Sequence, residues 1–132
     1  PSSYAAWGTG GWIAGNESAT IWHSGAIGNS TVVCASSDGS TWSQVLNVAC
    51  PAGATITAHP RILCDRITGM LAVVTPLSSG LAAIYVSLDG GLVWSDPILS
   101  TGSNVAGYAI ANGRLFCTVA ANLMGTLGVG MS

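Results

Sequence analysis

The sequence predicts an all-β fold, and two observations carry that prediction. Short apolar segments of strand length alternate with glycine-rich turns along the 132 residues, and no stretch shows a helical period of useful length. A turn pattern of serine, aspartate, glycine and tryptophan occurs twice, once from Ser36 and once from Ser87. Regular turns between short strands are typical of β-sandwiches, barrels and propellers.

The expected core strands are runs of Val, Ile, Leu, Ala and aromatic residues between turn formers. In chain order they are Gly11–Ala14, Thr31–Cys34, Met70–Val74, Ala82–Val86 and Leu115–Val119.

Residues 67–88 are uncharged and apolar enough to be considered as a membrane span. Their middle contains Thr75-Pro76 and then Ser78-Ser79-Gly80, which favour a turn. We therefore expect two strands joined by a turn, and no membrane insertion.

The composition indicates one compact domain, residues 1–132, and excludes several classes of protein. Hydrophobic residues make up 49% of the chain, so it is not disordered. Charged residues make up 6%, against roughly 25% in an ordinary globular domain. The chain has no lysine, and its net charge is −2. A nucleic-acid binder that works through phosphate contacts needs a basic patch, as does a polybasic membrane anchor, so neither is expected.

The residues of the repeated pattern each favour a hairpin turn for a physical reason. Asp-Gly is a strong hairpin signal because glycine adopts a positive φ freely. The carboxylate can accept hydrogen bonds from backbone amides of the turn, and the tryptophan can cover the base of the hairpin. The residues concerned are Ser36, Asp38, Gly39 and Trp42 in the first copy, and Ser87, Asp89, Gly91 and Trp94 in the second.

These segments, SSDGSTW and SLDGGLVW, resemble the Asp boxes (BNR repeats) of a β-propeller family that includes sialidases, sortilin-type receptors and many phage tail proteins. The second segment matches S-x-D-x-G-x-x-W fully, whereas the first is one residue short between Asp38 and Trp42. The resemblance implies a partial β-propeller of about two and a half four-stranded blades, covering residues 1–50, 51–100 and 101–132. A propeller usually needs four to eight blades to close, so we expect an oligomer or a part of a longer chain.

The acidic residues offer little for catalysis. Asp38 and Asp89 are turn residues of the repeat, and Asp96 stands in a Ser-Asp-Pro turn. Glu17 and Asp65 remain as a conceivable glycosidase pair, which would need two carboxylates facing one cleft. The alternatives are a solvated loop acid and an acid paired with an arginine.

The resemblance to sialidases also implies three arginines around a substrate carboxylate, and the chain has three, Arg61, Arg66 and Arg114. However, His59-Pro60-Arg61-Ile62 does not have the family's Arg-Ile-Pro order. We expect no catalytic residue, and a fragment of a sialidase-like glycoside hydrolase stays an alternative.

Aromatic residues outside the repeat are the candidates for ligand binding. Trp7, Trp22 and His23 lie among small polar residues, as in many sugar-binding faces and protein interfaces. The alternative is that Trp7 and Trp22 fill gaps between blades. His23 and His59 lack a third ligand at metal spacing, so no metal or cofactor is expected.

The four cysteines are too few and too scattered for a disulfide framework. Cys34, Cys64 and Cys117 stand in apolar runs and are expected to be buried. Cys50 is a candidate partner of Cys64, and the redox compartment stays open.

The expected function is therefore that of a non-catalytic structural or adhesive module, extracellular or part of a virion such as a phage tail fibre. Its expected partners are other protein subunits or a cell-surface glycan. A glycan-binding, lectin-type propeller is the first alternative.

Overall fold

The computed structural model describes the backbone of residues 12–16, 20–100, 105–119 and 126–130, and the side chains of residues 13–16, 20–100 and 107–116. All regular structure in this part of the chain is β-strand, which confirms the all-β prediction. The described residues contain no helix long and apolar enough to span a membrane.

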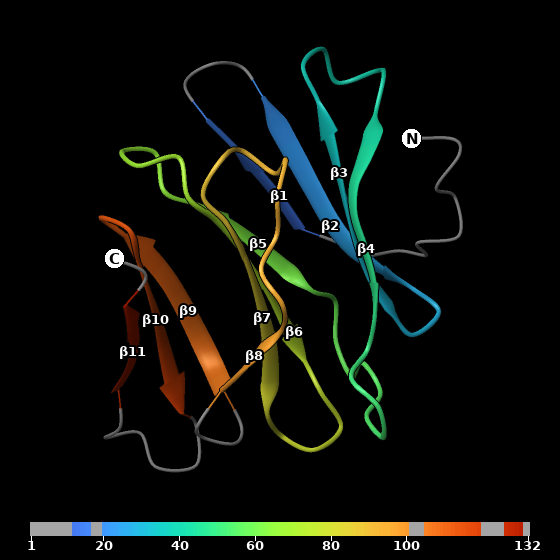
Figure 1. The fold of residues 1–132 in the computed structure, drawn as a ribbon, viewed down its shortest axis with the longest axis vertical. Coiled ribbons are helices and arrows are strands. Elements are labelled where there is room, and N and C mark those ends of the chain that lie inside the picture. Colours follow the sequence, from blue (N-terminus) through green and yellow to red (C-terminus); the bar gives the residue numbers. More distant parts are fainter. Residues whose placement is uncertain (1–11, 17–19, 101–104, 120–125, 131–132) are drawn as a thin grey trace.

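The strands form three antiparallel sheets, in each of which strands that follow one another in sequence are paired (Figure 1). The first sheet contains β1 (Trp12–Gly15), β2 (Ile21–Ile27), β3 (Ser30–Ser36) and β4 (Ser43–Ala49). The second contains β5 (Arg61–Cys64), β6 (Leu71–Pro76), β7 (Ala82–Ser87) and β8 (Ile98–Leu99). The third contains β9 (Val105–Ala111), β10 (Arg114–Val119) and β11 (Thr126–Gly130). The expected core strands correspond to β1, β3, β6, β7 and β10.

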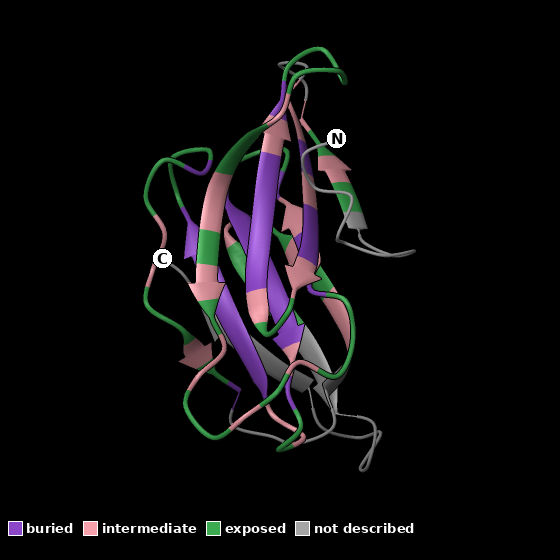
Figure 2. Ribbon diagram, turned by 90° about the vertical axis from the view of Figure 1, so that its right-hand side faces the viewer, coloured by how far each residue is buried: buried purple, intermediate pink, exposed green. Residues whose placement is uncertain are grey.

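The three sheets lie side by side, with the second sheet in the middle (Figure 1). The first strands of the sheets come together, because β1 contacts β5 and β5 contacts β9. Buried clusters lie on both faces of the middle sheet. Figure 2 shows the buried residues gathered on the central strands.

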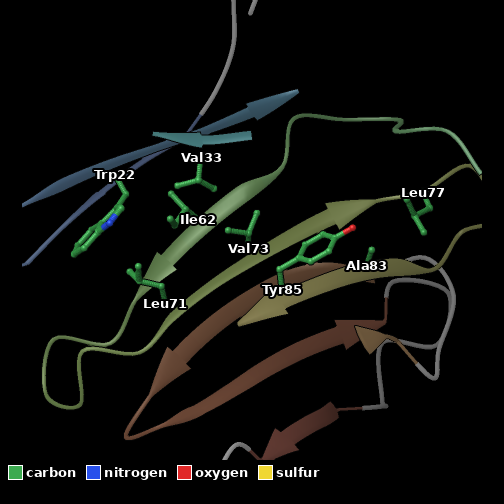
Figure 3. Close-up of a cluster of buried hydrophobic side chains, with 8 residues drawn as sticks. All are labelled: Trp22, Val33, Ile62, Leu71, Val73, Leu77, Ala83 and Tyr85. Carbon is green, nitrogen blue, oxygen red and sulfur yellow. The ribbon is translucent and has the colours of Figure 1, made fainter. Parts of the chain in front are cut away.

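One face of the middle sheet packs against the first sheet. Trp22 and Val33 of the first sheet face Val73 and Tyr85 of the second (Figure 3). Among the described residues, the buried side chains of this cluster are Trp22, Val33, Ile62, Leu71, Val73, Leu77, Ala83 and Tyr85.

The other face of the middle sheet packs toward the third sheet. Side chains at alternate positions, such as Ala72 and Val74, point to this side, since successive residues of a strand face opposite ways. The cluster consists of Met70, Ala72, Val74, Ala82, Ile84, Val86 and Leu115, with Tyr108 and Ile110 packed against it. Burial on both faces explains why β6 and β7 read as continuous apolar runs.

Residues 67–88, considered above as a possible membrane span, form two paired strands joined by a turn, as expected. Strand β6 ends at Pro76, and β7 pairs with it from Ala82 onward. In the intervening turn, the Leu77 amide donates to the Leu81 carbonyl at 2.9 Å, and Gly80 has a φ of 86°.

Buried hydrogen bonds join the first sheet to the second. The Thr31 and Thr75 hydroxyl groups share a hydrogen bond of 2.8 Å, and both residues are buried. The Ser24 hydroxyl donates to the Pro60 carbonyl at 2.6 Å. Each buried hydroxyl is thereby satisfied, which fixes the two sheets against one another.

The cysteine predictions hold only in part. Cys34 is fully buried, as expected. Cys64 is half-buried instead, and it packs against the core cluster that contains Trp22 and Tyr85. Cys50 and Cys64 are free thiols, so the candidate disulfide between them is not formed. The side chain of Cys117 lies outside the described residues.

Candidate functional site

The first Ser-Asp turn (36–42) is organised by its own side chains. Asp38 Oδ1 accepts hydrogen bonds from the Ser40 and Thr41 amides, both at 2.8 Å, and from the Ser36 hydroxyl at 3.0 Å. The Gly39 amide, at a φ of 77°, donates to Ser36 Oγ at 2.8 Å. The amide bonds, that of Thr41 first, lower the pKa of Asp38 below its ordinary value.

The second Ser-Asp turn (87–94) uses the same arrangement. Asp89 Oδ1 accepts from the Val93 amide at 3.0 Å and from the Ser87 hydroxyl at 2.8 Å. The Gly91 amide donates to Ser87 Oγ at 2.8 Å. The bond from Val93 is the main cause of a lowered pKa at Asp89. The carboxylate-to-amide bonds expected from the sequence are thus present in both turns.

The tryptophans of the turns are half-buried rather than fully buried. Trp42 packs beside Val32 and Cys34 on the first sheet. Trp94 packs against the core between the first and second sheets, and its Nε1 donates to the Gly91 carbonyl at 3.0 Å.

Trp22, expected as a candidate ligand-binding residue, has only 2% of its surface exposed. Its side chain lies in the core between the first two sheets (Figure 3), so it presents no face to a sugar. Its Nε1 has no hydrogen-bond partner, and a Cβ built on Gly91 would lie 3.6 Å from it. The tryptophan therefore fills the space beneath the second Ser-Asp turn, which matches the alternative that it fills a gap between sheets.

The structure describes His23, the second candidate binding residue, but not Trp7, the third. His23 is half-buried with its ring edge-on to Trp42, at 6.4 Å between centroids and 72° between planes. Burial lowers the pKa of His23. Trp7 lies outside the described residues. In the part of the chain that the structure describes, no three His, Cys, Asp or Glu residues gather as metal ligands.

Asp65 is a buried turn residue, not half of a visible carboxylate pair. Its Oδ2 accepts the Thr68 hydroxyl at 2.7 Å, and its Oδ1 accepts the Ile67 amide at 3.0 Å. The Gly113 amide of the third sheet also donates to it. These bonds, that of Thr68 first, lower its pKa. A hydroxyl and backbone amides are thus among its hydrogen-bond partners. Glu17 lies outside the described residues.

Two of the three arginines follow residues that are in contact. Arg66 follows Asp65, and Arg114, the first residue of β10, follows Gly113. The Gly113 amide donates to the Asp65 carboxylate. Arg61 begins β5, at the end of that strand away from Asp65.

A shallow apolar hollow opens beside the second Ser-Asp turn. Its volume is about 270 Å³, and we call it the Trp94 hollow. The residues that line it are Val86, Leu88, Asp89, Val93, Trp94 and Ser95. Leu88 and Val93 are 67% and 68% exposed, and the nearby Leu92 is 84% exposed.

The first Ser-Asp turn has no such apolar surface. Ser37, Ser40 and Thr41 stand where the second turn has Leu88, Leu92 and Val93. In both turns the aspartate carboxylate accepts hydrogen bonds from backbone amides, so the aliphatic side chains are not required by the turn itself. Sequence reasoning missed this hollow, although the polar-to-aliphatic difference between the two copies was the available signal.

Comparison of the chain with protein-family models, with curated proteins and with solved structures finds no match.

Proposed function

We propose that the chain is a non-catalytic structural or adhesive module that makes contacts with other protein subunits. The observation that carries this proposal is the exposed apolar surface of the second Ser-Asp turn around the Trp94 hollow. Contiguous exposed apolar side chains on a folded protein mark contact sites more often than they serve the fold. An extracellular or virion location, such as a phage tail fibre, belongs to the same proposal.

We further propose that the three sheets are blades of an Asp-box β-propeller. Two features support this architecture. In each sheet consecutive strands are neighbours, with the first strands β1, β5 and β9 adjacent to one another. In the first two sheets, a Ser-Asp turn leads from the third strand toward the fourth. Closure of such a ring would need further blades from the same chain or from other copies.

Glycan binding is the second candidate function. Trp94 and the Asp89 carboxylate line the same hollow, and an aromatic face beside a carboxylate is a usual sugar-binding combination. The other lining side chains include Val86, Leu88 and Val93, which have no hydrogen-bonding atoms for sugar hydroxyls. Because most of the lining side chains are apolar, the hollow fits an apolar side chain of a protein better than a sugar.

The test compares the wild-type chain with the variant Leu88→Ser/Val93→Thr, which gives two positions of the second turn the residues of the first. We expect the neutral apolar dye Nile red to bind the folded wild type and to lose at least half of its fluorescence signal with the variant. We expect no saturable binding on a glycan array. Absence of dye binding to the wild type would contradict an apolar contact surface, and saturable glycan binding would replace the proposal with a lectin function.

A further inference from the structure

We propose that the Trp94 hollow receives an aliphatic or aromatic side chain from a protein segment that carries a lysine or arginine beside it. This inference rests on the proposed protein-contact function and adds the chemistry of the partner. It concerns a hollow between the end of β7 and the second Ser-Asp turn.

The size and lining of the hollow fit a side chain. Its volume of about 270 Å³ is just below the range of roughly 300–1,000 Å³ that is usual for small-molecule pockets. Val86, Leu88, Val93 and the indole of Trp94 supply its apolar surface. A single Leu, Ile or Phe side chain entering it would remove apolar surface from water on both partners.

The hollow is held in shape before any partner binds. The Ser95 amide donates to the Val86 carbonyl at 2.8 Å, and the Val86 amide donates to Ser95 Oγ at 3.0 Å. The Trp94 indole is fixed by its bond to the Gly91 carbonyl. A site that is already ordered loses little conformational entropy on binding, so even a small contact area can give measurable affinity.

The charges around the hollow select a cationic neighbour. Asp89 lines it and is exposed, and the hydrogen bonds at its Oδ1 favour its ionised form. Asp96, also exposed, follows the lining residue Ser95. Among the described residues, no arginine lines the hollow, and the chain has no lysine. The negative charge of Asp89 and Asp96 therefore attracts a lysine or arginine and disfavours an acidic segment.

The experiment uses the full chain labelled with ¹⁵N and two acetylated, amidated peptides, SLKLKS and SLELES. Both carry the same leucines and differ only in charge. We expect SLKLKS to shift the backbone NMR signals of residues 86–96 and to bind at least about tenfold more tightly than SLELES.

Three variants test whether SLKLKS binds at the Trp94 hollow. Leu88→Ser/Val93→Thr should weaken SLKLKS binding at least about tenfold, because it replaces the two exposed aliphatic side chains of the lining with polar ones and removes none of the backbone bonds of the turn. Asp96→Asn should weaken it about threefold, since one of two nearby carboxylates is lost. Ile67→Ser removes a side chain that is 84% exposed on a different turn and should leave binding unchanged.

The possible failures are distinguishable. Equal binding of SLKLKS and SLELES, with both lost in Leu88→Ser/Val93→Thr, would overturn the cationic partner and leave the protein-contact function standing. No binding of either peptide up to about 1 mM would overturn both proposals. Signal shifts outside residues 86–96 that persist in Leu88→Ser/Val93→Thr would overturn the hollow as the site.

Discussion

The packing of the first sheet against the second depends on a buried pair of hydroxyl groups that can be tested one at a time. Thr31 on β3 and Thr75 on β6 are 0% and 1% exposed, and their Oγ1 atoms lie 2.8 Å apart. Valine has nearly the shape of threonine without the hydroxyl. The substitution Thr31→Val therefore leaves the Thr75 hydroxyl buried without its partner, and Thr75→Val does the same to Thr31.

An orphaned buried hydroxyl costs about 1–3 kcal/mol, so each single variant should lower the free energy of unfolding by that amount. In the double variant both hydroxyls are replaced by methyl groups in contact, which is close to neutral. The losses of unfolding free energy in the two single variants should therefore add up to at least about 2 kcal/mol more than the loss in the double variant. Urea denaturation of the wild type and the three variants measures this difference, provided that the denaturant slopes agree.

Thr57→Val serves as the control, because Thr57 is exposed and its hydroxyl makes no inter-sheet bond. Its effect should stay within about 0.5 kcal/mol. If the effects of Thr31→Val and Thr75→Val simply add in the double variant, to within about 0.5 kcal/mol, the two hydroxyls are not partners and the inter-sheet contact is wrong.

Further predictions follow from the core and the turns. Trp22→Ala should destabilise the fold by about 3–5 kcal/mol in urea denaturation, because a large side chain leaves the core; a variant as stable as the wild type would contradict its burial. Tyr85→Phe should be neutral or stabilising by about 1 kcal/mol in the same assay, since the Tyr85 hydroxyl is buried without a hydrogen-bond partner; a clear loss of stability would reveal a partner. The pKa values of Asp38, Asp65 and Asp89 are all lowered in the folded chain, so their stabilising contribution is complete above about pH 4 and is lost as the pH falls through the folded-state pKa values. The urea midpoint should therefore be lower at pH 3 than at pH 6, and an unchanged or higher midpoint would count against these carboxylate bonds.

Local chemistry made much of the fold predictable. Strand β6 ends at Pro76, and Gly80 lies in the turn before β7. Both residues act through their own backbone preferences. The hydrogen bonds of Asp38 and Asp89 were predictable for the same reason, because each carboxylate binds amides within four residues of itself.

Contacts between distant segments were not predictable in this way. Trp22 is buried because the second sheet and its turn at Gly91 cover it. The residues near Trp22 in the sequence do not predict this contact. Asp65 binds the Gly113 amide, which is 48 residues away. The Trp94 hollow likewise depends on how the turn lies against the end of β7, although Leu88 and Val93 could have been noticed as departures from the polar first copy.

The clearest test of the protein-contact role is the ratio of two dissociation constants. The peptide SLKLKS is titrated into the wild-type chain and into Leu88→Ser/Val93→Thr, with binding followed through the NMR signals of residues 86–96. We predict that the variant binds at least about tenfold more weakly, because the apolar lining of the Trp94 hollow makes the contact. Equal dissociation constants for the two proteins would contradict that role.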